Sequence, residues 1–166
     1  MSRGFVNEDD QEEIPLVPPR ADLPEGVINY VTQVGMDELL DEHQKLLDEI
    51  DQIDGSNEKE KRIETNYIHA KLQLLNERIS SAKIIDLNTQ PKEEVRFGAT
   101  VTLQVGNETK LQTYQIVGVD EADIGKRKIA FISPIAKILI NKKVGEKAVL
   151  KLATEDRLFE IKEIRY

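Results

Sequence analysis

The residues best suited to chemistry are the acidic side chains around a turn near the middle of the chain. Five carboxylates flank Gly55: Asp48, Asp51, Asp54, Glu58 and Glu60. Carboxylate oxygens are the ligands that Mg²⁺ prefers, usually one or two of them together with waters and a substrate phosphate. Asp51, Asp54 and Glu58 are therefore candidate residues for presentation to a metal ion that is held elsewhere. The alternative is a solvated acidic surface, partly neutralised by the neighbouring basic residues Lys59, Lys61 and Arg62.

The rest of the sequence offers no catalytic motif. It contains no Cys, which excludes disulfides, thiolate metal sites and a cysteine nucleophile. It has neither a glycine-rich phosphate loop nor a nucleophile elbow. The two histidines, His43 and His69, stand outside any metal-ligand motif, and His43 is interpreted as a residue at the edge of a helix core. We predict no catalytic residue, no metal ligand set and no cofactor of the protein's own.

Two helices must position the acidic turn. Thr32 is a suitable N-cap, and core residues then recur every three or four positions at Met36, Leu39, His43, Leu46, Ile50 and Ile53. After the turn residues 54–57, a second series follows at Ile68, Leu72, Leu75, Ile79 and Ala82. The four-residue turn predicts an antiparallel helical hairpin over residues 32–86, rather than the alternative of a parallel dimer. A helix over residues 33–53 would be about 31 Å long.

The segment before the hairpin, residues 1–31, is acidic and rich in proline. Its prolines at positions 15, 18, 19 and 24 lack amide donors and bias their neighbours toward extended conformations. We therefore predict no regular helix or sheet in this segment. Two interpretations stay open: a disordered tail, or an extended strap in which Ile14, Leu16 and Val17 dock onto a groove of this protein or of a partner.

After the hairpin, residues 87–91 are interpreted as a linker and residues 92–166 as a separate domain. Five stretches of this domain have the composition of strands: 95–105, 113–119, 128–132, 148–152 and 157–164. Ser133 followed by Pro134 is typical of a helix start and predicts one short helix through about Ile140. The expected fold class is α+β, with an N-terminal helical hairpin and a C-terminal antiparallel sheet that carries one helix.

The net charge of −8 is unevenly spread. Residues 1–31 carry two basic and seven acidic side chains, residues 32–86 seven and thirteen, and residues 87–166 fourteen and eleven. The two acidic segments would repel a phosphate backbone, which disfavours direct nucleic-acid binding by them. No stretch approaches the roughly 18 to 20 apolar residues of a membrane span, and residues 1–31 do not resemble a signal peptide. We expect a monomeric cytoplasmic protein with neither a membrane partner nor sequence-specific nucleic-acid binding.

A set of ordered motifs stands out in the C-terminal half: residues 97–101 (FGATV), 114–123 (YQIVGVDEAD), 132–140 (ISPIAKILI), 144–146 (VGE) and 159–164 (FEIKEI). The start of the hairpin, residues 32–35 (TQVG), and its exit, residues 82–86 (AKIID), belong to the same pattern. Together these motifs resemble the bacterial Gre (GreA/GreB) transcript cleavage and elongation factors. The resemblance covers roughly residues 32–53 and 67–166.

This resemblance implies a C-terminal domain like the FK506-binding proteins, which docks at the rim of the secondary channel of RNA polymerase. The hairpin would then enter the channel toward the active site. In members that stimulate cleavage, an Asp and a Glu in a Gly-Asp-x-x-Glu-Asn pattern at the tip help to hold Mg²⁺ and activate water. The polymerase then cuts the backtracked RNA, so the factor itself is not an enzyme, and any Mg²⁺ belongs to the polymerase site.

Three departures from the family pattern bear on function. Ser56 and Lys59 stand where the two acids of the tip pattern are expected. The hairpin is shorter than a cleavage-active member implies, and a loss of two turns would withdraw the tip by about 11 Å, far beyond a coordination distance of roughly 2 Å. Residues 1–31 have no counterpart in the usual pattern. The sequence therefore favours a polymerase-binding regulator that occupies the channel without efficient cleavage.

Other functions stay open. One is an active cleavage factor whose acids come from Asp51, Asp54 or Glu58 through a different geometry. Another is a coiled-coil adaptor unrelated to polymerase. A peptidyl-prolyl isomerase, which fold analogy suggests, is disfavoured because residues 87–166 contain only five aromatic side chains and no Trp.

The matching positions expected near the polymerase surface are Asp120, Glu121 and the segment Ser133-Pro134-Ile135-Ala136. Charge reversal at Asp120 and Glu121 is expected to weaken polymerase binding while the domain stays folded. The alternative is that Asp120 and Glu121 form an ordinary turn, while Pro134 and Ile135 start a helix and fill the core.

Overall fold

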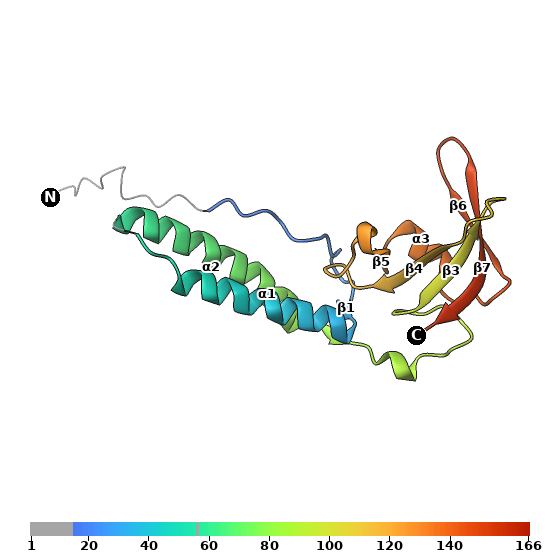
Figure 1. Ribbon diagram of the computed structural model, residues 1–166, viewed down its shortest axis with the longest axis horizontal. Helices are drawn as coiled ribbons and strands as arrows, with labels where there is room; N and C mark the ends of the chain where they lie inside the picture. The colour runs from blue at the N-terminus through green and yellow to red at the C-terminus, as the bar shows by residue number, and fades with distance from the viewer. Residues whose placement is uncertain (1–14, 56) are drawn as a thin grey trace.

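The computed structural model describes residues 15–55 and 57–166, so the predictions that concern residues 1–14, Ile14 included, and Ser56 lie outside the described residues. Two parts follow one another along the long axis of the molecule, a helical hairpin and a curled sheet with one short helix (Figure 1). This arrangement confirms the predicted α+β class. Among the described helices, none is long and apolar enough to cross a membrane.

The hairpin consists of α1 (Gln33–Asp51) and α2 (Glu58–Ser81), which pack against each other within one chain. The hydroxyl of Thr32 accepts a hydrogen bond from the Gly35 amide at 2.9 Å, which confirms Thr32 as the N-cap of α1. Asn57 caps α2 in the same way through the Lys59 amide at 3.0 Å. The core of the hairpin follows the predicted spacing, with Val31, Leu39, Leu46, Ile68, Leu72 and Leu75 buried. His43 is half-buried at the edge of this core.

A two-stranded parallel sheet joins the two ends of the hairpin. β1 (Tyr30–Val31) pairs with β2 (Lys83–Ile84), so the prediction that residues 1–31 contain no sheet is wrong at its last two positions. The cause is tertiary: the hairpin brings its incoming and outgoing segments side by side. The Lys83 amide then donates to the Asn29 carbonyl at 2.8 Å, and the Ile85 amide donates to the Val31 carbonyl at 3.0 Å.

The segment between hairpin and sheet is not wholly irregular. Asp86 caps a single 3₁₀ turn, η2 (Leu87–Thr89), through the Asn88 amide at 3.0 Å. The Leu87 side chain packs against Gly98, whose φ of 87° is in the left-handed region that favours glycine. A Cβ at Gly98 would lie 2.0 Å from Leu87 Cδ2, so only glycine fits this position.

The C-terminal sheet has the strand order β5-β4-β3-β7-β6. The strands are β3 (Thr100–Val105), β4 (Gln112–Val117), β5 (Lys128–Ala130), β6 (Lys147–Lys151) and β7 (Asp156–Arg165). All pairs are antiparallel except β4 with β5, which is parallel, so the prediction of a wholly antiparallel sheet is wrong at this edge. Residues 118–127, which include a 3₁₀ turn, η3 (Ile124–Lys126), carry the chain back so that β5 starts beside Gln115, in the middle of β4.

One helix, α3 (Pro134–Leu139), covers the core of this domain. Ser133 is its N-cap and Pro134 is at its first turn, as predicted, and the helix ends one residue before the predicted position. Alternate residues of β3 and β7 supply the centre of the core, where Val101, Leu103, Phe159 and Ile161 are at most 1% exposed.

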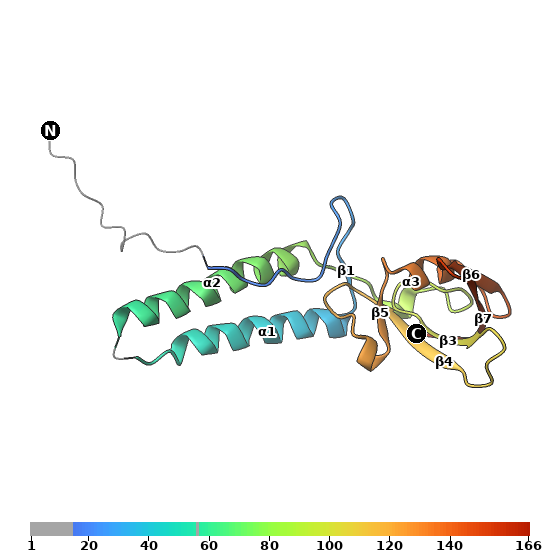
Figure 2. The same ribbon diagram turned by 90° about the horizontal axis from the view of Figure 1, so that it is seen from above.

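The proline-rich residues 15–23, here called the strap, run in an extended path beside the hairpin toward its base (Figures 1 and 2). Leu16 is 95% exposed, so it does not dock onto a groove of this protein, and its docking onto a partner stays a prediction. Val17 is half-buried and borders a hollow of about 440 Å³ together with Leu74 and Arg78 of α2. The main polar contact of the strap is made by Arg20, which the sequence did not single out.

Leu75 is 0% exposed at the centre of the hairpin core, so the Leu75→Ala variant should lose about 2 to 5 kcal/mol of unfolding free energy through the cavity it leaves. Leu40 of α1 is 47% exposed, so Leu40→Ala is the matched control and should lose less than about 1 kcal/mol of unfolding free energy. Urea unfolding followed by circular dichroism measures both. Equal losses in the two variants would contradict a core centred on Leu75.

Candidate functional site

The acidic residues of the hairpin tip are spread around the turn. Asp51 is the last residue of α1, Asp54 lies in the connecting loop, and Glu58 is the first residue of α2. All three side chains are exposed. Among residues 15–55 and 57–166, no group of three His, Cys, Asp or Glu side chains could hold a metal ion. The structure therefore does not assemble Asp51, Asp54 and Glu58 into a preformed metal site.

Part of this acidity has a local structural role. Glu58 and Glu60 lie in the first turn of α2, where the exposed amides and the helix dipole favour negative charge. Asp51 has the opposite relation to α1, because it lies at the C-terminal end and no basic residue occupies that last turn. With 19 and 24 residues, α1 and α2 are about 28 and 36 Å long.

The second set of candidate residues lies where the hairpin meets the C-terminal domain. Glu121 is only 6% exposed, and its carboxylate accepts hydrogen bonds from the Thr32 hydroxyl and from Lys128 Nζ, the latter at 2.9 Å. Since the Thr32 hydroxyl also caps α1, the start of the hairpin is tied directly to the C-terminal domain. Gly35 makes this approach possible: a Cβ there would lie 2.7 Å from Glu121 Oε1.

Asp120 belongs to the same joint. Its side chain is 7% exposed and forms an ion pair with Arg20 of the strap, with 3.1 Å between Arg20 Nε and Asp120 Oδ1. Arg78 of α2 approaches the other carboxylate oxygen at 3.7 Å. The two terminal nitrogens of Arg20 bind the Glu42 carboxylate of α1 at 2.7 and 3.0 Å. The hydrogen bond to Glu42 raises the pKa of Arg20, opposed by burial and reinforced by Asp120.

These contacts bear on one expectation from the sequence. Asp120 and Glu121 do lie in a turn, but both carboxylates are buried: Asp120 pairs with Arg20 of the strap, and Glu121 pairs with Lys128 of its own domain and binds the Thr32 hydroxyl of the hairpin. Charge reversal at either position would place like charges together in a buried site, so we now expect such variants to lose stability as well as binding. A loss of binding in such variants would not identify a docking surface.

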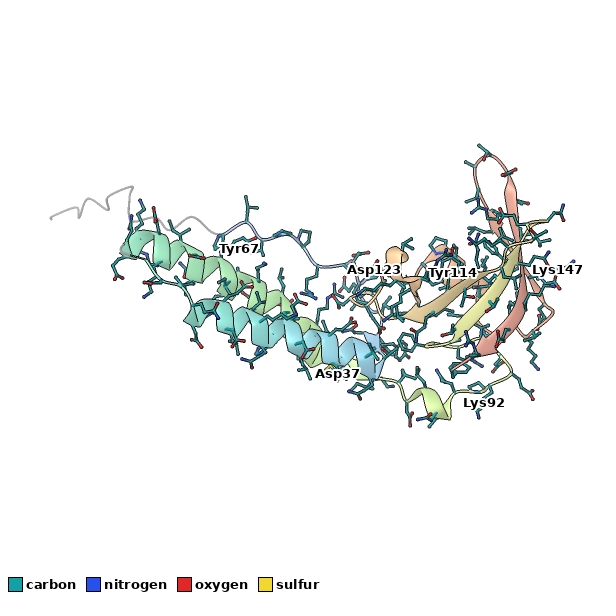
Figure 3. All side chains as sticks on the ribbon, viewed as in Figure 1. Asp37, Tyr67, Lys92, Tyr114, Asp123 and Lys147 are labelled. Atoms are coloured by element: carbon teal, nitrogen blue, oxygen red, sulfur yellow. The ribbon has the colours of Figure 1, made fainter. Side chains whose placement is uncertain are left out.

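An aromatic cluster completes the joint. The rings of Tyr30, Phe97 and Phe131 have centroids 5.6 to 5.8 Å apart, in tilted and edge-on arrangements. The Tyr30 carbonyl also lies so near Gly118 that a Cβ there would be only 2.5 Å from it. Figure 3 shows the side chains that fill the space between the base of the hairpin and the sheet. This cluster comes from three separate segments, so no local pattern in the sequence predicts it.

The remaining candidate segment is partly accessible. Ser133 is half-buried and accepts a hydrogen bond from the Ala136 amide at 3.3 Å, while Ala136 is fully buried. Ile135 packs against the core of the sheet domain. Pro134 alone of these four residues is exposed. Pro134 starts the helix and Ile135 packs in the core, as the alternative interpretation predicts, and the exposed Pro134 can still contact a partner.

Arg20, Glu42, Arg78 and Thr32 are joint residues whose partners could not be foreseen. One signal existed for Arg20, because it is one of only two basic residues in the acidic segment 1–31. A lone cation among acids and prolines is a candidate for an ion pair, but its partners lie 22 and 100 positions away in the sequence.

Comparison with known proteins identifies relatives of this chain. The family model "Transcription elongation factor, GreA/GreB, C-term" matches residues 90–166. The transcription elongation factor GreA of Halorhodospira halophila is 41% identical over 106 residues, which cover 63% of this chain and 67% of that protein. GreA of Rhodospirillum rubrum is 29% identical over 155 residues, with 93% and 99% covered. The chain thus spans about two thirds of the first relative and nearly all of the second.

Among solved structures, the transcription factor Gfh1 is similar at a TM-score of 0.41 and 22% identity, with 82% of this chain and 97% of that chain covered. At this score the structural likeness adds nothing to the sequence match.

Glu121→Gln should lose about 2 to 4 kcal/mol of unfolding free energy, because Lys128 and the Thr32 hydroxyl lose their buried charged partner. Glu160→Gln is the matched control, since Glu160 also pairs with a lysine, at 3.2 Å, but 30% of its side chain is exposed. The control should lose less than about 1 kcal/mol. Urea unfolding compares the two variants, and a loss at Glu121 no larger than at Glu160 would count against Glu121 as the tie between the two parts.

Proposed function

This chain belongs to the GreA/GreB family of transcription elongation factors, and we propose that it binds RNA polymerase at the secondary channel and regulates elongation without efficient transcript cleavage. Members of this family are elongation factors rather than enzymes, so any RNA cleavage would be catalysed by the polymerase. The observation that carries the proposal is the pairing of a family-matched C-terminal domain with a hairpin tip whose described residues form no carboxylate group able to hold a metal ion.

In this proposal the C-terminal domain docks at the rim of the channel and the hairpin points inward. Support comes from the elongated shape, with the hairpin at one end of the molecule and the matched domain at the other (Figure 1). The hairpin, with seven basic and thirteen acidic side chains over residues 32–86, suits a basic protein surface or a metal-bearing site rather than nucleic acid. Pro134 is the docking position best placed for contact, because it is exposed on the sheet domain.

The lack of efficient cleavage follows from chemistry and from length. The Asp and Glu of the Gly-Asp-x-x-Glu-Asn pattern meet Ser56 and Lys59 here, and a Lys cannot serve as a carboxylate ligand. A hairpin two turns shorter would also hold its tip about 11 Å back, whereas coordination requires a distance of roughly 2 Å. The protein would then act by competing with other channel-binding factors, or by changing pausing and nucleotide entry.

The second candidate function is stimulation of cleavage by the polymerase. The exposure of Asp51, Asp54 and Glu58 at the tip favours it, because these carboxylates are free to approach a Mg²⁺ ion held in the polymerase. The protein would bring no cofactor of its own in either case. A coiled-coil adaptor unrelated to polymerase is the third alternative.

We further propose that the protein acts as a cytoplasmic monomer, with no membrane partner and no sequence-specific nucleic-acid binding. The monomer is supported by the pairing of the two hydrophobic seams within one chain, which leaves no seam for a parallel dimer.

The decisive assay adds the protein to backtracked elongation complexes of the cognate polymerase with Mg²⁺ and follows RNA length over time. We expect the RNA to keep its length, and we expect the protein to inhibit cleavage stimulated by a proficient Gre factor in the same complexes. Shortened RNA would favour the second candidate function. If the triple variant Asp51→Asn, Asp54→Asn, Glu58→Gln no longer shortens the RNA, stimulation of cleavage depends on these carboxylates. A protein with neither effect would favour the adaptor.

Pro134→Glu should weaken binding to core polymerase about tenfold, because it places a charge at the exposed docking position. The fold should persist, since an acid in the first turn of a helix is favourable. Pro91→Glu is the matched control, because Pro91 is also exposed but lies outside the docking segment. Binding measured with labelled protein tests both variants, and equal affinities would remove Pro134 from the interface.

A further inference from the structure

The direct joint between the hairpin and the C-terminal domain is confined to one end of the hairpin. Its contacts involve Tyr30, Thr32 and Gly35 on one side and Gly118 and Glu121 on the other. These hairpin residues lie within about one and a half turns of the start of α1, and Arg78, which approaches Asp120 at 3.7 Å, lies in the last turn of α2 at the same end of the hairpin. A joint of this kind holds the two parts together but resists swinging of the hairpin poorly, because its contacts have a short lever arm.

Arg20 provides a contact with a longer lever arm. Its partner Glu42 is ten residues beyond Thr32, which corresponds to about 15 Å along α1. The two hydrogen bonds to Glu42, at 2.7 and 3.0 Å, form a bidentate pair, which fixes direction as well as distance. The third bond of the same guanidinium reaches Asp120 of the C-terminal domain at 3.1 Å.

Burial makes the Asp120 end of this bridge hard to replace by water, whereas the Glu42 side chain at the other end is 44% exposed. The side chains of Asp120 and Arg20 are 7% and 19% exposed, so their charges are partly withdrawn from solvent and depend on each other. Arg78 Nε of α2 lies 3.7 Å from Asp120 Oδ2, so the two residues form an ion pair but no hydrogen bond. Arg78 also donates to the carbonyl of Ala21, so the second helix holds the strap next to Arg20. The strap, both helices and the C-terminal domain therefore meet at one charge cluster.

We propose that the strap is an intramolecular clamp, in which Arg20 acts as a positioning residue that sets the angle between the hairpin and the C-terminal domain. Without this bridge, the hairpin would pivot about the joint at residues 30–35. With α1 about 28 Å long, a swing of roughly 20° would displace the tip by about 10 Å. The relevance of that displacement for polymerase rests on the proposed function, whereas the clamp itself is a property of the free protein.

Spin-label distances in the free, full-length protein test the clamp. The chain has no Cys, so the double variant Glu60→Cys, Lys151→Cys takes one nitroxide near the hairpin tip and one on β6, both at exposed positions. We expect one narrow distance distribution when Arg20 is present. Arg20→Ala should at least double its width, and adding Glu42→Gln to Arg20→Ala should broaden it no further, because both changes break the same bridge.

Arg96→Ala is the matched control, since Arg96 pairs with Glu94 at 2.9 Å entirely within the C-terminal domain. Its distribution should stay narrow. An equally narrow distribution in Arg20→Ala, or equal broadening in Arg96→Ala, would overturn the clamp. If Arg20→Ala folds poorly, Arg20→Gln replaces it, because Gln keeps much of the aliphatic side chain. The same broadening of the distance distribution is expected. A narrow wild-type distribution that broadens on loss of Arg20 supports the clamp, even if the protein does not bind polymerase; such a failure to bind would count only against the proposed function.

Discussion

The buried carboxylate of Glu121 connects the two halves of this molecule, and much of the surrounding structure exists to accommodate it. The Thr32 hydroxyl donates to Glu121 and also caps the first helix. The N-terminus of α1 is therefore bonded to the sheet domain through the same group that starts the helix. Lys128 balances the charge from the strand β5, and Gly35 leaves the room that the carboxylate needs. A single ionised group thus couples helix initiation, strand placement and the relative position of the two parts.

Around this centre the protein combines two kinds of contact. The aromatic rings of Tyr30, Phe97 and Phe131 supply apolar burial at the joint, which is strong but not directional. The ion pairs of Arg20 with Glu42 and Asp120 supply direction at a greater distance from the pivot. The strap that carries Arg20 is extended and rich in proline, so it loses little conformational freedom when it is fixed in place.

The sequence was sufficient where the structure depends on local periodicity. The seam through Leu39, Leu46, Leu72 and Leu75 predicts the hairpin, and Thr32 and Ser133 are correct as caps because capping is a local interaction. Local signals failed where pairing is decided by the tertiary fold. The strand at Tyr30–Val31 has only two residues and exists because the ends of the hairpin meet, and the parallel edge strand β5 depends on how residues 118–127 return.

The candidate site shows the same limit. Asp120 and Glu121 were singled out because their segment matches a family motif, but neither motif nor composition reveals that a carboxylate is buried. The charge of Arg20 among acids and prolines indicates an ion pair, but its partners are too distant in the sequence to be predicted. The tip acids were easy to find, since charge at a turn is visible in the sequence, yet their separation in space was not.

The short parallel pairing of β1 with β2 also defines the hairpin as a closed unit, entered and left at neighbouring points. Its base is set by residues 29–35 and 82–85, at the end of the hairpin opposite the described residues of the tip (Figure 1). Two turns of each helix can therefore be added or removed as a matched heptad pair, which preserves the seam and leaves the base unchanged. The reach of such a hairpin is adjustable in steps of about 10 Å, independently of the domain that carries it. An evolving lineage can change how far the arm extends without redesigning where it is anchored.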